Sequence, residues 1–189
     1  MKKKQVALFG GAFDPPHIGH QKVATVVTTD FIDEVWFVPV FTHPWAEKYQ
    51  KQVMAPYQDR LEMLSLIVAE RQQIAEYKDV SFTYPTLQYF EAKYPDYTFS
   101  WIMGSEYISR FDAFLAGHPQ LVDYTFYMYP RVGYPLENLL PNMVGLFGME
   151  EVAASSTEIR TAIRKHKPID ALVHPRVATY IQEHNLYQE

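Results

Sequence analysis

The stretch VALFGGAFDPPHIGHQKVA, residues 6–24, decides the fold because an apolar run leads directly into glycines, prolines and two histidines. Residues 5–10 have the apolar continuity of a buried strand, and residues 18–30 have the pattern of a helix. Gly10 and Gly11 stand where the strand ends. Glycines at such a point let the backbone turn sharply and let a ligand approach the main chain.

Two histidines stand at the start of the predicted helix. Pro15 and Pro16 keep the helix from starting early, and His17 and His20 are three residues apart, so they can face the same side. A helix N-terminus adds about half a positive charge and free N–H donors. The stretch therefore predicts a small cationic concavity that suits phosphate.

Taken alone, the two histidines have a simpler interpretation. A tight loop that carries His17 and His20 as surface imidazoles fits the same pattern. A zinc site fits poorly, because no third ligand stands at a telling distance. The residues thus leave open whether this loop binds an anion.

The rest of the chain alternates apolar runs with helix-like segments. Predicted strands cover residues 34–40, 97–104 and 124–130, and predicted helices cover 57–70, 83–94, 156–166 and 175–185. This alternation predicts an α/β fold, a Rossmann-like doubly wound parallel sheet with helices on both faces. In such sheets ligands bind beyond the carboxyl ends of the strands, where the glycines, prolines and histidines fall.

Composition limits the classes of function. The 189 residues fit one domain, and a net charge of −5 with no basic tract beyond residues 2–4 argues against a nucleic-acid polymer as partner. The chain has no cysteine, which excludes disulfides, thiolate nucleophiles and cysteine zinc sites. No apolar run approaches the ~20 residues that cross a bilayer, and none resembles a signal peptide. We therefore expect a cytoplasmic protein with no membrane partner.

A second candidate anion site lies in the segment SSTEIR, which begins at Ser155. Ser155 and Glu158 match a capping box with Ser155 as N-cap, which leaves free N–H groups in the first turn. With the Ser156 and Thr157 hydroxyls and Arg160, these groups form a candidate anion cradle. An ordinary capped helix with exposed arginines has the same pattern. Glu158 opposes phosphate binding unless its carboxylate points back at the cap.

The first string as a whole, Gly10-Gly11-x-Phe13-Asp14-Pro15-x-His17-x-Gly19-His20, resembles the signature of the nucleotidylyltransferase superfamily, whose core is HxGH. It is most similar to GGxFDPxHxGH of the nicotinate/nicotinamide mononucleotide adenylyltransferases, which act in NAD synthesis. SSTEIR is similar to the family's [ST]STxIR motif, and residues 174–187 resemble its closing helix. The resemblance implies a single nucleotidylyltransferase domain over residues 1–189, with SSTEIR in a C-terminal helical segment at about 155–189.

The resemblance also implies a reaction, in which the acceptor's phosphate attacks the α-phosphorus of ATP and pyrophosphate leaves. The ATP-binding residues that it implies are Gly10, Gly11, Phe13, His17, His20, Gly104, Ser156, Thr157 and Arg160. The catalytic candidates are His17, His20 and Arg160, with His20 nearer the transition state. We expect Mg²⁺ to arrive on the triphosphate rather than in a protein metal site, since the sequence shows no dedicated carboxylate cage. The implied partners are ATP and a mononucleotide acceptor, and the oligomeric state stays open, a homo-oligomer included.

The acceptor side resembles the family less closely. The candidate acceptor-binding residues are His43, Trp45, Lys48, Thr83, Glu106 and Phe111. The first three lie in one loop, and an ordinary surface loop with no role in binding explains this segment equally well. Pro85 stands where the family often has an acid, Glu106 replaces an aspartate, and Phe111 is among the aromatics nearest the position of a family tryptophan.

Two arginines are further candidates. Residues 60–64 resemble the family's Arg-x-x-Met-Leu helix, which implies that Arg60 guides the nucleotide, although an exposed helix charge fits equally. Arg131, after the strand at 124–130, resembles a family arginine that implies a contact to ATP. The acceptor stays open between nicotinate and nicotinamide mononucleotide. Two other readings remain: a related transferase acting on phosphopantetheine or an alcohol phosphate, and a non-catalytic nucleotide sensor.

Overall fold

The computed structural model describes residues 3–41, 55–79 and 82–188. The strands are β1 (Lys4–Gly11), β2 (Glu34–Pro39), β3 (Gln72–Ile74), β4 (Tyr97–Gly104), β5 (Phe126–Tyr129) and β6 (Met143–Gly145). The helices are α1 (Ile18–Asp30), α3 (Tyr57–Ser65), α4 (Thr83–Lys93), α5 (Phe111–Gly117), α6 (Ser156–Arg164) and α7 (Pro175–Glu183), with short 3₁₀ helices η1 (Ser105–Arg110) and η2 (Pro119–Asp123). The candidate residues His43, Trp45 and Lys48 lie outside the described residues.

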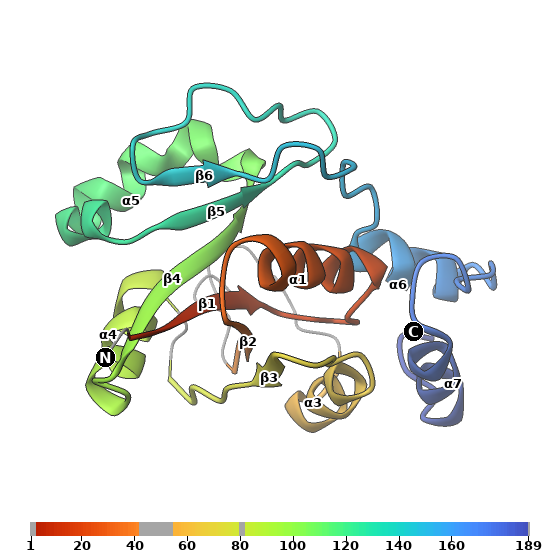
Figure 1. Cartoon of the computed structure of the whole chain (residues 1–189). Helices are drawn as coiled ribbons and strands as arrows, with labels where there is room; N and C mark the ends of the chain where they lie inside the picture. The colour runs from red at the N-terminus through yellow and green to blue at the C-terminus, as the bar shows by residue number, and fades with distance from the viewer. Residues whose placement is uncertain (1–2, 42–54, 80–81, 189) are drawn as a thin grey trace.

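Within the described ranges, the strands form one six-stranded sheet in the order β3-β2-β1-β4-β5-β6, and every neighbouring pair is parallel. The chain builds outward from β1 to β3 and then returns to place β4 on the other side of β1 (Figure 1). This is the doubly wound order, and it confirms the predicted Rossmann-like α/β fold. The order reverses between β1 and β4, so the crevice for a ligand lies beyond the carboxyl ends of these two strands.

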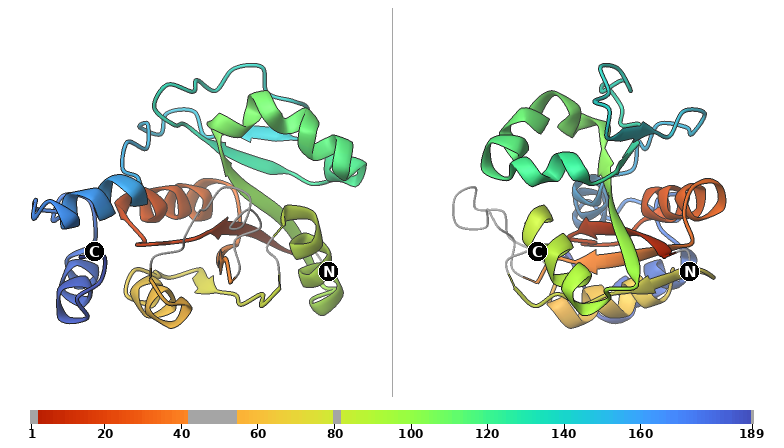
Figure 2. Two further views of the ribbon diagram at one scale, coloured as in Figure 1. Left: turned by 180° about the vertical axis from the view of Figure 1, so that it is seen from behind. Right: turned by 60° about the vertical axis from the view of Figure 1, so that its left-hand side comes forward.

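The two faces of the sheet bury two separate hydrophobic cores. Along β1, Ala7 and Phe9 point into a core with α1, α3, α6 and α7, whereas Val6 and Leu8 point into a core with α4 and α5. Side chains of a strand alternate between faces, so a continuous apolar run is what a strand covered on both sides requires. The two views of Figure 2 show helices on either side of the sheet.

The predicted elements agree with the structure where the apolar pattern is long. The helix at 18–30 and the strand at 97–104 have the predicted bounds, but the helix predicted over 57–70 ends at Ser65. Its apolar pattern continues in Ile67, which packs into the core from the turn that follows. The sequence reading missed β3, β6 and α5, because segments of three to seven residues are too short to show a period. No helix in the described part of the chain is long and apolar enough to cross a bilayer.

Candidate functional site

The loop between β1 and α1 turns at Phe13 rather than at the glycines. Gly10 and Gly11 belong to β1, and a Cβ on Gly10 would lie 2.5 Å from Cζ2 of Trp101. The backbone instead adopts a positive φ of 49° at Phe13, whose ring is only 1% exposed. The expected sharp turn at the glycines is therefore wrong. Glycine is needed at position 10 because the Trp101 ring packs closely against the backbone there, and not because the chain turns at this residue.

His17 and His20 form a stacked pair at the start of α1. Their ring centroids are 3.7 Å apart, and the rings are inclined by 27°. The His17 backbone N–H donates to Nδ1 of His20 at 3.2 Å, so a neutral His20 carries its proton on Nε2. The Phe13 ring packs edge-on against that of His20, with the two ring centroids 4.9 Å apart. The predicted juxtaposition of the two imidazoles is confirmed.

Gly19 makes room for this pair. A Cβ at that position would lie 2.5 Å from Cγ1 of Val152 and 3.0 Å from Cε1 of His17. Any side chain there would push α1 away from the segment before α6 or displace the His17 ring. A side chain at position 19 is therefore excluded by Val152 and His17. The contact with Val152 is not visible in the local sequence.

Burial keeps both imidazoles neutral. The His17 side chain is 4% exposed, and within the described residues its Nδ1 has no hydrogen-bond partner. Burial, together with the nearby positive charge of Arg131, lowers the pKa of His17 to about 4. Burial, then His17 and Arg131, lower the pKa of His20 well below its usual value. At neutral pH the pair therefore offers N–H donors rather than cations, and the positive charge at this site comes from arginines and helix N-termini.

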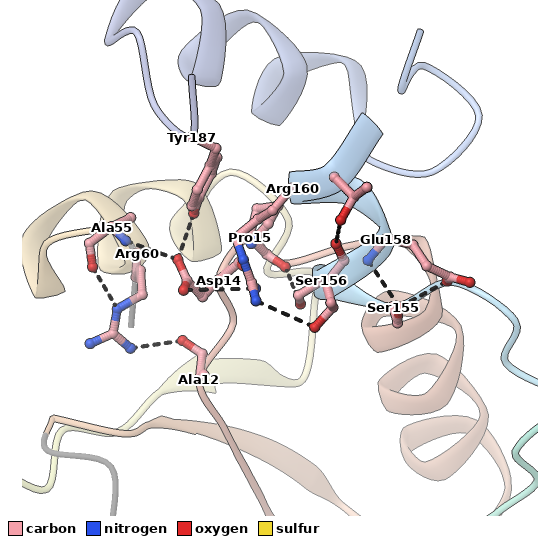
Figure 3. Close-up of polar contacts among 12 residues, drawn as sticks. Ala12, Asp14, Pro15, Ala55, Arg60, Ser155, Ser156, Glu158, Arg160 and Tyr187 are labelled. Atoms are coloured by element: carbon pink, nitrogen blue, oxygen red, sulfur yellow. Dashed lines mark hydrogen bonds and ion pairs between the residues drawn. The ribbon is translucent and has the colours of Figure 1, made fainter. Parts of the chain in front are cut away.

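The start of α6 has the predicted cap. Ser155 Oγ accepts a hydrogen bond from the Glu158 N–H at 3.2 Å, which confirms Ser155 as the N-cap. The same hydroxyl donates to Oε2 of Glu158 at 2.8 Å (Figure 3). The carboxylate is thereby held at the cap, where Glu158 also lines a pocket with Arg131.

Two hydrogen bonds join the start of α6 to the loop before α1. Ser156 Oγ donates to the Pro15 carbonyl at 2.9 Å, and Arg160 Nη1 donates to the Asp14 carbonyl at 2.7 Å (Figure 3). Arg160 also donates from Nη2 to Thr157 Oγ1 at 3.3 Å. These contacts bring together segments that are 146 residues apart in the chain. The two predicted phosphate motifs therefore lie in contact beyond the carboxyl end of β1.

Asp14 lies at the centre of a buried polar cluster. Its Oδ1 accepts from the Ala55 N–H at 3.2 Å and from the Tyr187 hydroxyl at 2.8 Å. Arg60, which is 1% exposed, donates to the Ala12 carbonyl at 2.7 Å and to the Ala55 carbonyl at 3.3 Å. Arg60 is therefore not an exposed helix charge. The Arg60 guanidinium instead binds main-chain carbonyls, including that of Ala12 in the loop after β1.

The carboxyl ends of β4 and β5 supply a third part of the site. Arg131 Nε lies 3.9 Å from Glu106 Oε2, and the Arg131 guanidinium donates to the carbonyls of Val152 and Ala154 at 3.3 and 3.4 Å. Together with the start of α6, these residues line an open pocket of about 360 Å³. A Cβ on Gly104 would collide with the Glu106 carboxylate. Within the described residues, Glu106 Oε2 is buried without a hydrogen-bond partner.

Two further candidates, Phe111 and Thr83, lie in the described part of the chain. Phe111 is 0% exposed and packs in the core, where its ring meets that of Phe126 edge-on at 4.8 Å. Its ring therefore offers no free face for stacking on a ligand. Thr83 is half-buried at the first position of α4. Of the acceptor candidates that the structure describes, Glu106 thus lies beside Arg131 and the start of α6, whereas Phe111 is part of the core.

Sequence reasoning missed the roles of Asp14, Arg60 and Tyr187. Asp14 stands inside the first motif, but nothing in its local pattern names its partners. Those partners lie 41 residues away at Ala55 and 173 residues away at Tyr187. A local pattern shows only periodicity and turns, so contacts over such separations become visible in the fold alone.

Comparison with known families gives a consistent result. A family described as cytidylyltransferase-like matches residues 8–162. A protein of Halalkalibacterium halodurans named "Probable nicotinate-nucleotide adenylyltransferase" is 32% identical over 98% of this chain and 92% of its own length. A protein of Shouchella clausii with the same name is 35% identical over 97% of each chain.

Solved structures with the same fold are also known. Plasmodium falciparum nicotinic acid mononucleotide adenylyltransferase complexed with NaAD superimposes with a TM-score of 0.80 over 97% of both chains, at 22% identity. The same enzyme complexed with APC gives a TM-score of 0.78 at 20% identity. These identities are low, so the two structures support the fold, and the sequence matches carry the assignment. The chain belongs to the cytidylyltransferase-like family and, within it, to the nicotinate-nucleotide adenylyltransferases.

Proposed function

We propose that this protein transfers the adenylyl group of ATP to nicotinate mononucleotide and releases pyrophosphate, a step in NAD synthesis. The family supports this activity, since its members are named for the reaction. The structural observation that carries it is the pair of hydrogen bonds from Ser156 and Arg160 to the loop before His17. They place two helix N-termini at one point, and helix N-termini bind phosphate.

The triphosphate of ATP binds between the starts of α1 and α6. His17 and His20 donate N–H groups to the α- and β-phosphate oxygens from one side. From the other side, Arg160 and the free N–H groups of Ser156 and Thr157 bind the β- and γ-phosphates. Within the described residues, Arg160 makes two hydrogen bonds to the protein, and a guanidinium carries five N–H donors, so donors remain for phosphate.

The reaction needs positioning and charge stabilisation more than proton transfer. An oxygen of the acceptor's phosphate forms a bond to the α-phosphorus, and the bond from that phosphorus to the bridging oxygen breaks. The attacking oxygen already carries negative charge, so no general base has to remove a proton from it. Negative charge grows on the leaving pyrophosphate, where Arg160 and the N-terminus of α6 stabilise it. Because His17 is buried and the two imidazoles are stacked, their donors need little rearrangement in the transition state.

Mg²⁺ enters with ATP in this proposal. Bound to the triphosphate, the ion neutralises part of its charge. No group of three or more histidine, aspartate or glutamate side chains that could hold a metal occurs among the described residues. Oδ1 of the nearby Asp14 carboxylate accepts hydrogen bonds from Ala55 and Tyr187. This donor set suits a structural carboxylate rather than a metal ligand.

A panel of acceptors tests the proposal. The protein is mixed with Mg-ATP and, separately, with nicotinate mononucleotide, nicotinamide mononucleotide or phosphopantetheine, and pyrophosphate release is followed. We expect the fastest turnover with nicotinate mononucleotide. Faster turnover with the amide or with phosphopantetheine would overturn the choice of acceptor. ATP binding without turnover on every acceptor would instead indicate a nucleotide sensor.

A further inference from the structure

A buried arginine of α3 contacts the loop that leads to the imidazoles. Arg60 Nη1 donates to the Ala12 carbonyl at 2.7 Å, and Nε donates to the Ala55 carbonyl at 3.3 Å (Figure 3). The guanidinium also lies over the Tyr57 ring, with Cζ 5.3 Å from the ring centroid. The contacts with Ala55 and Tyr57 are local, whereas the contact with Ala12 reaches 48 residues back along the chain.

A buried guanidinium is a costly way to fill space. Burial lowers the pKa of Arg60, and the nearby Asp14 carboxylate acts in the opposite direction. Arginine stays charged in proteins, so this position removes a cation from water. The side chain supplies a charge near Asp14 and a hydrogen bond to Ala12. Only the second contribution, together with the bond to Ala55, needs the planar fork of a guanidinium.

The Ala12 carbonyl belongs to the peptide unit that sets φ at Phe13. That φ is 49°, in the left-handed region, which is unfavourable for a residue with a Cβ. A flip of this peptide unit would bring φ at Phe13 into the extended region. The same flip would turn the Ala12 carbonyl away from Arg60. The hydrogen bond from Arg60 therefore opposes the movement that would relax Phe13.

The conformation at Phe13 decides where its buried ring lies. The ring packs edge-on against Phe37, with centroids 5.5 Å apart, and against His20, with centroids 4.9 Å apart. His20 in turn stacks on His17 at 3.7 Å. A series of contacts thus runs from the Arg60 guanidinium through the Phe13 ring to the two imidazoles.

We propose that Arg60 is a positioning residue for the imidazole pair. Its hydrogen bond to the Ala12 carbonyl holds Phe13 in the left-handed conformation, and the Phe13 ring holds His20 in its stack on His17. The effect on turnover rests on the proposed function. The protonation of the two histidines reports the same role without any substrate.

Arg60→Lys tests the hydrogen bond at constant charge, because an ammonium lacks the planar fork that binds two carbonyls. We expect kcat to fall about tenfold, since a small displacement of the imidazoles weakens their contact with the transition state. The KM for ATP should change less than about twofold, because Arg160 and the start of α6 are untouched. Steady-state pyrophosphate release measures both constants.

Arg71→Lys is the matched control. The Arg71 guanidinium also donates to two main-chain carbonyls, that of Asp33 at 2.8 Å and that of Ile32. Those carbonyls lie between α1 and β2, at the amino ends of the strands and therefore away from the proposed site. This variant should match the wild type in kcat, in KM and in the titration of the histidines.

Titration of the imidazoles separates positioning from stability. Burial and the charge of Arg131 keep the pKa of His17 low, and burial, His17 and Arg131 do the same for His20. If Arg60→Lys loosens the stack, water reaches the rings, and both pKa values should rise toward about 6.5. NMR of the ring signals in the folded protein measures this rise. A loss of stability alone would leave the pKa values of the folded state unchanged.

Phe13→Leu tests the same series of contacts without replacing the buried arginine. Leucine keeps an apolar side chain but lacks the ring edge that meets His20. We expect a fall in kcat and a rise in both histidine pKa values, as in Arg60→Lys. In a double-mutant cycle the two effects should be less than additive, because both act through one contact.

Four results would overturn the proposal. One is an unchanged histidine titration in Phe13→Leu or in folded Arg60→Lys, and another is an equal effect in the Arg71→Lys control. A third is a rise in the KM for ATP with kcat unchanged, and a fourth is full additivity in the double mutant. A wild type that transfers no adenylyl group would contradict the proposed function alone, and the titrations would still decide the role of Arg60.

Discussion

The two helix starts that face the proposed triphosphate are built on different principles. At α1 the donors are two stacked imidazoles, the buried one of His17 and the partly buried one of His20, and desolvation lowers both of their pKa values. At α6 the helix start is more open, with a serine cap and a partly exposed guanidinium that stays charged. One end therefore offers neutral, rigid donors, and the other offers a permanent positive charge.

The difference suits the two ends of the substrate. A neutral donor beside the α-phosphorus attracts the departing pyrophosphate less than a cation would. Its hydrogen bond to a phosphate oxygen strengthens as negative charge develops in the transition state. A cation beside the outer phosphates binds the part of ATP that carries the most negative charge and departs as pyrophosphate. Similar motifs at helix N-termini therefore acquire different electrostatics through burial. Changing each end in turn should have unequal effects.

The largest effect is expected at α1. His20→Ala removes a donor from the rigid end, and losing one preorganised donor costs about 3 kcal/mol, or roughly a hundredfold in kcat/KM. Steady-state pyrophosphate release measures the loss. The matched control is His184→Ala, because His184 also stacks on a ring, that of Tyr180, at 4.0 Å. Near-normal turnover in His20→Ala, or an equal loss in the control, would contradict the assignment.

The second effect concerns protonation at the same end. His17 takes a proton at a pH of about 4 in the folded protein, against about 6.5 in the unfolded chain. Because the unfolded state binds the proton first as the pH falls, stability is lost on acidification. We expect a loss of about 2 kcal/mol between about pH 7 and about pH 5 from this group.

Urea unfolding at several pH values measures that loss. His17→Gln should flatten the dependence of the unfolding free energy on pH, and the slope that remains would belong largely to His20, whose pKa is lowered too. Identical pH slopes in the wild type and the variant would show that His17 is not held neutral by burial.

The third effect probes the permanent charge at α6. Arg160→Lys keeps a cation but loses the planar fork that binds the Asp14 carbonyl and a phosphate together. We expect the KM for ATP to rise about tenfold, with a smaller fall in kcat. Arg164→Lys, one turn further along the same helix and exposed, is the control and should behave as wild type. An unchanged KM in Arg160→Lys would remove Arg160 from the ATP site.

The smallest effect tests the acid at the α6 cap. Glu158→Gln keeps a side-chain oxygen that can accept from Ser155 but removes the negative charge near the phosphates. Helix stability should fall by about 0.3–0.5 kcal/mol, and pyrophosphate should bind up to about twofold more tightly. Calorimetry and thermal melting measure the two changes. Weaker pyrophosphate binding in this variant would mean that Glu158 assists the site rather than opposing it.

Local sequence predicted the architecture well, because the decisive signals are periodic. The apolar run before Gly10 and the helical pattern after Pro16 place a strand and a helix around the first loop. The cap at Ser155 also follows from residues within one turn. The two predicted phosphate motifs, far apart in the chain, also contact each other in the fold. The acceptor side was harder, since a buried core ring such as Phe111 and an exposed stacking ring look the same in a sequence.

By itself, the sequence determined the parallel α/β fold, the two helix starts and the family resemblance, because these depend on residues that are neighbours in the chain. Only the tertiary structure decided that the loop turns at Phe13, that the imidazoles are neutral, and that Arg60 and Tyr187 hold the loop. The physical reason is that protonation depends on burial and that polar contacts depend on distance in space. Both are fixed only when distant segments, α3 and the C-terminal residues, pack against the loop after β1.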